Sequence, residues 1–150
     1  MLRIVFFGTP KFASTILEAL ITDGNYDIVG VVTQPDKEVG RKKEIKYSPV
    51  KELAIKHNIK VLQPRRIKKE FKEILDLKPD MIVTAAYGQI IGEEILNYPK
   101  YKCVNVHASL LPKYRGGAPI QRAIMNGDSS TGITIMYMAK GMDDGDMLLQ

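Results

Sequence analysis

Continuous runs of apolar residues alternate with helical patterns along most of the chain. The apolar runs cover residues 2–7, 28–33 and 81–86, and each is followed by a turn or by a helix signal. Runs without polar alternation are typical of strands that are buried on both faces of a parallel sheet. We therefore expect an α/β fold, with a Rossmann-like open twisted sheet that is mostly parallel and has helices on both faces.

Two helices are predicted between these strands. The first covers residues 11–23, with its apolar side chains at helical spacing, and Gly24 is well placed to end it. The second begins with Ser48 as N-cap and Pro49 at the first helical position, and it ends near His57. We interpret His57 as a surface residue at the end of this helix.

The pattern changes near the end of the chain. Residues 131–139 alternate like a strand, residues 141–146 are rich in turn formers, and residues 147–149 are apolar again. This order predicts a hairpin that adds an antiparallel strand near the C-terminal end of the sheet. Because the chain stops at Gln150, inside a predicted strand, we expect residues 1–150 to be one domain truncated from a longer protein.

Composition agrees with a single domain of ordinary size. The 150 residues are 45% hydrophobic, which is enough for a real core. The opening apolar run is too short for a signal peptide or a membrane span. The single cysteine, Cys103, forms no internal disulfide, so we expect a cytoplasmic protein and interpret Cys103 as buried packing.

Positive charge is concentrated in two segments. The formal net charge is +5; residues 37–51 carry +4, residues 65–73 carry +3, and the rest of the chain carries −2. Such local excess is typical of a surface that binds a polyanion. A solvated Lys-rich surface without a partner is the alternative, and for residues 65–73 it takes the form of a solvated helix face.

The common nucleotide and metal fingerprints are missing from the sequence. The first strand-to-helix turn reads Gly8-Thr9-Pro10-Lys11, which is neither G-x-G-x-x-G nor a P-loop. An NAD-dependent oxidoreductase therefore remains only as a fallback. With two histidines and one cysteine, a built-in metal site is not expected.

Candidate chemistry lies in the segment Cys103-Val104-Asn105-Val106-His107. Its alternation predicts a strand with Asn105 and His107 on one face, about 6.5–7 Å apart. At the carboxyl end of a strand, where open α/β sheets bind ligands, an amide donor and an imidazole can stabilise an oxyanion or move a proton. A hydrogen-bonded polar pair with no catalytic role is the alternative interpretation.

Four segments in order give this interpretation a specific direction. Residues 105–116 read NVHASLLPKYRG and resemble the signature of the folate-dependent formyltransferases. The segments 86–91 (AYGQII), 131–134 (TGIT) and 142–146 (MDDGD) are similar to other elements of that family. The resemblance covers essentially the whole chain.

The resemblance implies formyl transfer from 10-formyltetrahydrofolate, without a metal, to an amine. It implies that Asn105, His107 and Asp143 are catalytic, with the adjacent Asp144 as a minor rival. Asn105 and His107 would stabilise the oxyanion of the tetrahedral intermediate, and Asp143 would take or steer the amine proton. The implied folate contacts, for which loop packing is the alternative, are Gly88, Gln89, Ile90, Ile91, Ser109, Leu110, Leu111 and Pro112.

The acceptor is inferred from the basic segment 33–51. It resembles the long loop with which members of the family that formylate methionyl initiator tRNA contact the acceptor stem, and Arg41, Lys42 and Lys43 match its tRNA-binding positions. We therefore expect a bacterial-type monomer that acts on initiator Met-tRNA in translation initiation. A family member that formylates glycinamide ribonucleotide or an amino-sugar, and a fragment that binds folate or tRNA without turnover, are the alternatives.

Overall fold

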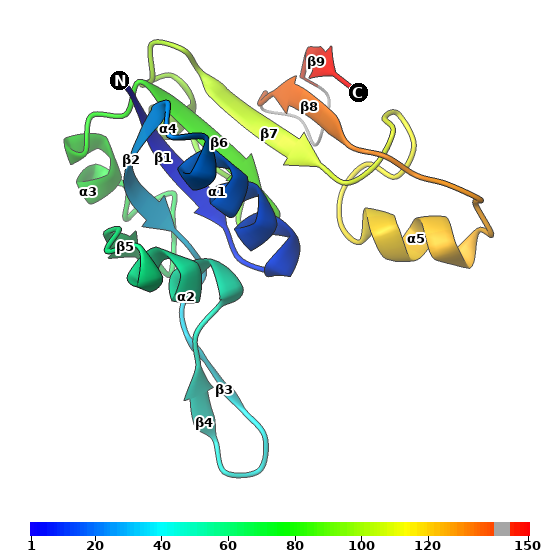
Figure 1. The fold of residues 1–150 in the computed structure, drawn as a ribbon, viewed down its shortest axis with the longest axis horizontal. Coiled ribbons are helices and arrows are strands. Elements are labelled where there is room, and N and C mark those ends of the chain that lie inside the picture. The colour runs from blue at the N-terminus through cyan, green and yellow to red at the C-terminus, as the bar shows by residue number, and fades with distance from the viewer. Residues whose placement is uncertain (140–144) are drawn as a thin grey trace.

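An open twisted sheet forms the centre of the molecule (Figure 1). The computed structural model describes residues 1–139 and 145–150. Over these residues the sheet has seven strands, of which the first five run parallel and the last two antiparallel to their neighbours. The prediction of a mostly parallel sheet with an antiparallel addition near the C-terminal end is confirmed. From edge to edge the strands are β5 (Val61–Leu62), β2 (Tyr26–Val32), β1 (Leu2–Gly8), β6 (Met81–Ala85), β7 (Cys103–His107), β8 (Thr134–Tyr137) and β9 (Met147–Leu149).

Helices lie on both faces of the sheet because its central strands bury side chains on both sides. In β1, Ile4 and Phe6 belong to the core on one face, and Val5 and Phe7 to the core on the other. The first core includes residues of α1 and α2, and the second includes residues of α3 and α4. These helices are α1 (Lys11–Asp23), α2 (Pro49–Lys56), α3 (Lys72–Asp76) and α4 (Glu93–Leu96).

Both predicted helices form, and their ends follow local chemistry. α1 has the predicted bounds and ends at Gly24, whose φ of +76° is a left-handed conformation that glycine adopts without strain. α2 begins after Ser48, whose Oγ accepts a hydrogen bond from the backbone N–H of Lys51 at 3.1 Å. Its C-cap is His57, which is exposed as predicted.

The basic segment after β2 is more ordered than the predicted loop. β3 (Lys37–Val39) and β4 (Glu44–Lys46) pair as an antiparallel hairpin that projects from the body of the molecule (Figure 1). The turn between them is closed by two positive φ angles, +74° at Gly40 and +51° at Lys43. The hairpin escaped prediction because strands of three residues are too short to show an alternating apolar pattern.

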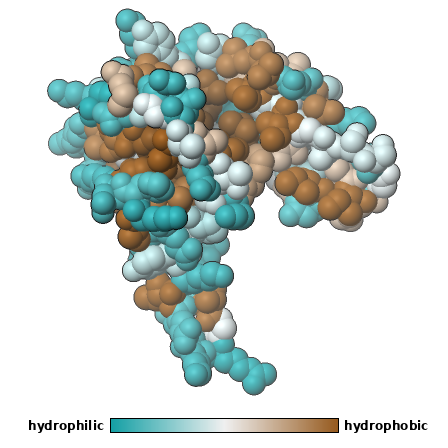
Figure 2. Space-filling model, in the orientation of Figure 1, coloured by the Kyte–Doolittle hydropathy of each residue, from teal (hydrophilic) through white to brown (hydrophobic). Residues whose placement is uncertain are grey.

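The chain leaves the sheet after β7 and returns to it in β8. Between them lies α5 (Pro119–Met125), which has a proline at its first position and lies apart from the sheet (Figure 1). Its last residues, Ile124 and Met125, are exposed (Figure 2 shows the hydrophobic surface of this part). In the part of the chain that the structure describes, no helix is long and apolar enough to cross a membrane.

Candidate active site

A cavity of about 550 Å³ opens at the carboxyl edge of the parallel strands. Its walls come from the turn after β1, the loop after β6, the end of β7 and the start of α5. Asn105 and His107 both line it, so the structure brings the two predicted polar residues into one site. The size and position agree with a small-molecule site of an open α/β sheet.

The amide of Asn105 is oriented by the neighbouring strand. β6 and β7 pair so that Thr84 is directly beside Asn105, and the Thr84 hydroxyl donates a hydrogen bond to Asn105 Oδ1 at 2.7 Å. Thr84 is buried at 3% exposure, so water does not compete for this contact. Because Oδ1 accepts from Thr84, the N–H donors of Asn105 are on the other arm of the planar amide and point away from Thr84.

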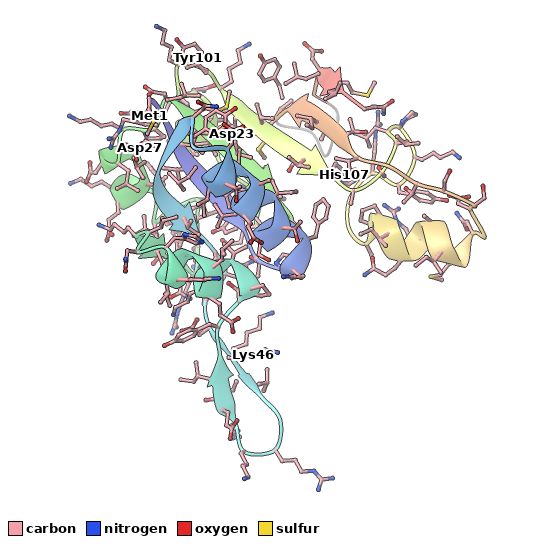
Figure 3. All side chains as sticks on the ribbon, in the orientation of Figure 1. Met1, Asp23, Asp27, Lys46, Tyr101 and His107 are labelled. Carbon is pink, nitrogen blue, oxygen red and sulfur yellow. The ribbon has the colours of Figure 1, made fainter. Side chains whose placement is uncertain are left out.

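His107 is held by the loop that follows its own strand. The residue is buried at the end of β7 (Figure 3), and its Nε2 lies 2.8 Å from the backbone oxygen of Tyr114. A carbonyl oxygen only accepts hydrogen bonds, so Nε2 carries a proton and donates it. Tyr114 is fixed in turn, because its hydroxyl donates to Asp128 Oδ2 at 2.5 Å and accepts from Asn126 Nδ2 at 3.0 Å.

The third predicted catalytic residue, Asp143, lies outside the described residues, as does its rival Asp144. The last described cavity-lining residue before these aspartates in the sequence is Met138, which follows β8. The choice between the two carboxylates therefore stays a prediction.

The predicted folate residues divide into two groups in the structure. Gly88, Gln89 and Ile91 line the cavity, whereas Ile90 points to solvent with 67% of its surface exposed. Residues 109–112 lie outside the lining, and their polar groups bind elsewhere in the protein. Ser109 Oγ donates to Lys113 O, Thr134 Oγ1 donates to Ser109 O, and the backbone N–H of Leu111 donates to Thr134 Oγ1.

Several lining residues were missed by sequence reasoning. Besides Thr84, they include Phe12 from the start of α1 and Tyr87 from the loop after β6. Tyr87 packs edge-on against Phe7, with ring centroids 5.2 Å apart, and its buried hydroxyl has no hydrogen-bond partner among the described residues. Burial raises the pKa of Tyr87, so its hydroxyl stays protonated. In the sequence, the position of Tyr87 next to Gly88 was the one signal that it could line the site.

The predicted polyanion-binding residues Arg41, Lys42 and Lys43 are all exposed at the tip of the hairpin. Figure 2 shows this projection as mostly hydrophilic toward its tip, and Figure 3 marks its base side with Lys46. Among the described residues, none of the three tip residues takes part in an ion pair. Three cations are thus presented to solvent on a short arm.

The second basic segment, residues 65–73, is mostly not helical. Residues 65–71 form turns, and α3 begins only at Lys72, so this cluster is not a helix face. Its lysines and arginines are exposed, and Glu70 is bound locally because its Oε2 accepts from the backbone N–H of Arg66. The alternative of a solvated helix face therefore applies only to Lys72 and Glu73, which lie in α3.

Acidic, histidine and cysteine side chains do not cluster as metal ligands anywhere in residues 1–139 and 145–150. Cys103 is buried, and burial raises the pKa of its thiol to about 12. A protonated thiol is a poor nucleophile, which agrees with the interpretation of Cys103 as core packing.

Comparison with known proteins places this site in a family. The family model described as "Formyl transferase" matches residues 2–150. The chain belongs to the formyl transferase family. Two curated relatives are the methionyl-tRNA formyltransferases of Bacillus thuringiensis subsp. konkukian and of Bacillus anthracis, each 60% identical over 152 aligned residues. The match covers 100% of this chain and 48% of each relative, so the chain spans about half the length of these proteins.

Solved structures of other formyltransferases share the fold. A phosphoribosylglycinamide formyltransferase from Bacillus halodurans gives a TM-score of 0.77 at 24% identity, covering 97% of this chain and 76% of that one. A sugar N-formyltransferase from a Shewanella species gives 0.66 at 22% identity, covering 100% and 56%. The Rossmann-like class of the fold is confirmed.

Proposed function

We propose that residues 1–150 form a catalytic domain that transfers a formyl group from 10-formyltetrahydrofolate to the amino group of methionyl initiator tRNA. The observation that carries the proposal is that Asn105 and His107 line the same cavity at the carboxyl edge of the sheet. Membership in the family and 60% identity to methionyl-tRNA formyltransferases support the reaction and the acceptor.

The cavity is suited to a reduced folate in size and in chemistry. Its volume of about 550 Å³ is within the range of small-molecule sites. Phe12, Tyr87 and Ile91 supply apolar wall for an aromatic ring system, and Gly88 lets the backbone approach closely. The proposed donor site therefore includes Gly88 and Ile91, with the formyl end toward Asn105 and His107.

In the proposed reaction the amine nitrogen forms a bond to the formyl carbon, and the bond from that carbon to N10 of the folate breaks. The amine loses one proton, and the departing N10 gains one. Asn105 donates an N–H to the carbonyl oxygen as it becomes negative, and His107 lies beside it on the same strand face. We assign the proton transfer to Asp143, which completes the trio implied by the family resemblance.

The hairpin supplies the proposed contact with the acceptor stem. Arg41, Lys42 and Lys43 are exposed at its tip, where they can reach phosphates of a nucleic acid lying beside the cavity. An arginine binds a phosphate with two parallel hydrogen bonds, so Arg41 is the strongest single candidate. The lysines add charge without fixed geometry.

Formyl transfer to charged initiator tRNA by the 150-residue chain tests the proposal directly. Asn105→Ala is expected to lower the rate by about 10²- to 10³-fold, since it removes one oxyanion donor. Asp143→Asn and Asp144→Asn, compared side by side, should show the larger loss at Asp143. Lys60→Gln is the control, because Lys60 is exposed and precedes β5 at the amino edge of the sheet, away from the cavity.

The choice of acceptor distinguishes this proposal from the activities of other formyltransferases. Glycinamide ribonucleotide and an amino-sugar nucleotide should give no product where methionyl initiator tRNA does. Product from either small acceptor alone would overturn the assignment of tRNA. Binding of folate without turnover on any acceptor would overturn the catalytic role of this chain.

A further inference from the structure

The loop after β6 is fastened to neighbouring segments by the side chain of Gln89. Its Nε2 donates to Gln34 Oε1 at 2.8 Å and to the backbone oxygen of Pro64 at 3.1 Å. Its Oε1 accepts from the backbone N–H of Ile67 at 2.9 Å. A side-chain amide has two N–H donors, so both are used inside the protein. Gln89 lines the cavity, yet its polar atoms serve the protein and not a ligand.

Gln34 is where the chain leaves β2 for the hairpin. Its backbone oxygen accepts from Gln63 Nε2 at 3.3 Å, and its backbone N–H donates to Thr9 Oγ1 at 3.4 Å. Its side chain also lies against Gly88, where an added Cβ would be 2.6 Å from Gln34 Nε2. One end of the hairpin therefore rests directly on the loop that forms the cavity wall.

A second group of contacts holds both ends of the hairpin to the body. Lys51 Nζ donates to the two carboxylate oxygens of Asp36 at 3.1 and 2.8 Å and to Gln63 Oε1 at 3.0 Å. Gln63 Nε2 completes the group by donating to Asp36 Oδ1 at 2.8 Å. The Lys51 ammonium also lies 3.8 Å from the centre of the Tyr47 ring, just beyond β4. The base of the hairpin is thus well defined, and Gln34 is its link to the cavity.

The bond from Gln89 to Gln34 is the direct side-chain link between the cavity loop and the hairpin base, and Thr9 adds a second path because its hydroxyl donates to Tyr87 O and accepts from the backbone N–H of Gln34. The inference drawn from this link rests on the proposed function. We propose that Gln89 is a positioning residue that couples occupancy of the cavity to the placement of the basic hairpin tip. A ligand against residues 86–91 restricts that loop, and the bond from Gln89 to Gln34 passes the restriction to the hairpin base. The second ligand then loses less conformational freedom on binding, which makes the two binding events cooperative.

Coupling between sites typically changes affinity by about 5- to 150-fold, and a single hydrogen-bonded link belongs at the lower end. The measurement is the affinity of the 150-residue chain for a fluorescent RNA hairpin of acceptor-stem length, with and without saturating 5-formyltetrahydrofolate. Folate is expected to tighten RNA binding about fivefold. In Gln89→Met, which keeps the side-chain length and removes the amide, the two affinities should agree within about twofold.

Gln34→Met breaks the same bond from the hairpin side and should remove the coupling equally, so the test does not depend on one variant folding. Lys60→Met introduces the same side chain at an exposed site and should retain the full effect. Two results would overturn this inference and leave the proposed function standing. One is independent binding of the two ligands to the parent chain, and the other is intact coupling in folded Gln89→Met and Gln34→Met. A parent chain that binds neither ligand would overturn the proposed function as well.

Discussion

Removing the charge at the hairpin tip gives the most quantitative test of the proposed RNA contact. The variant carries Arg41→Gln, Lys42→Gln and Lys43→Gln. All three side chains are exposed and make no ion pair among the described residues, so their loss should leave the fold unchanged. Glutamine suits the position of Lys43 as well as lysine does, because both carry a Cβ at the same φ of +51°.

The expected effect follows from counterion release. Each phosphate contact contributes about 0.7–0.9 to the slope of log affinity against log salt concentration. Three lost contacts should therefore reduce the slope by about 2–3. Between 50 and 200 mM salt, the parent chain should lose about 20- to 40-fold more RNA affinity than the variant does. Fluorescence anisotropy of a labelled acceptor-stem hairpin, titrated across this salt range, measures both slopes.

A control with the same change in charge separates local contact from general attraction. Lys60, Lys78 and Lys100 are exposed and precede β5, β6 and β7, at the amino edge of the sheet. Their joint replacement by glutamine also lowers the net charge by three, but it leaves the hairpin intact. If the two triple variants lower the slope equally, the hairpin tip is not the contact surface and the assignment of these residues fails.

The remaining predictions concern the cavity and its surroundings. Thr84→Val keeps the shape of the buried side chain but removes the hydrogen bond that orients Asn105. It should lower the formyl transfer rate about tenfold at unchanged thermal stability, which is less than the 10²–10³ expected for loss of the Asn105 donor itself. An unchanged rate would show that Asn105 is oriented without this bond. Gly88→Ala should destabilise the chain by about 1–3 kcal/mol in urea unfolding, because φ is +104° and the new Cβ would meet Gln34 at 2.6 Å; stability equal to the parent would contradict this. Burial raises the pKa of the Cys103 thiol from 9.0 to about 12, so its thiolate fraction at pH 8 is about a thousandfold lower than in the unfolded chain. Labelling with a thiol reagent should therefore accelerate only in denaturant or as the pH rises toward 12. Rapid labelling of the native chain would contradict the burial.

Local signals in the sequence were sufficient for the main helices and the central strands. The cap at Ser48, the proline after it and the glycine after α1 each act within one turn of backbone, so their effect does not depend on the rest of the fold. The central strands were recognised because burial on both faces requires uninterrupted apolar residues. The hairpin of residues 37–46 was missed because its strands are short and exposed.

Alternation along the sequence predicts site residues only within one strand, and Gly88, Gln89 and Ile91 were assigned to the site by family resemblance. Asn105 and His107 are two positions apart in β7, and alternation alone places them on one face. Thr84 joins them through the register between β6 and β7, which no local pattern encodes. Gln89 was assigned to the donor on resemblance, and only the positions of Gln34 and Ile67 show that its amide is used within the protein.

The segment of residues 109–112 shows how a site can depend on residues that do not line it. Thr134 of β8 bonds to Ser109 and to Leu111, and Ser109 bonds forward to the oxygen of Lys113. The next carbonyl, that of Tyr114, is the acceptor for His107 Nε2. The antiparallel pairing of β8 with β7 sets Thr134 directly beside His107, so one register fixes both the histidine and the loop that holds its proton. A shift of that register by one residue would turn Thr134 to the opposite face, and the loop would lose its anchor. The late antiparallel strand therefore helps to position His107, because it anchors the loop whose Tyr114 carbonyl accepts from His107 Nε2.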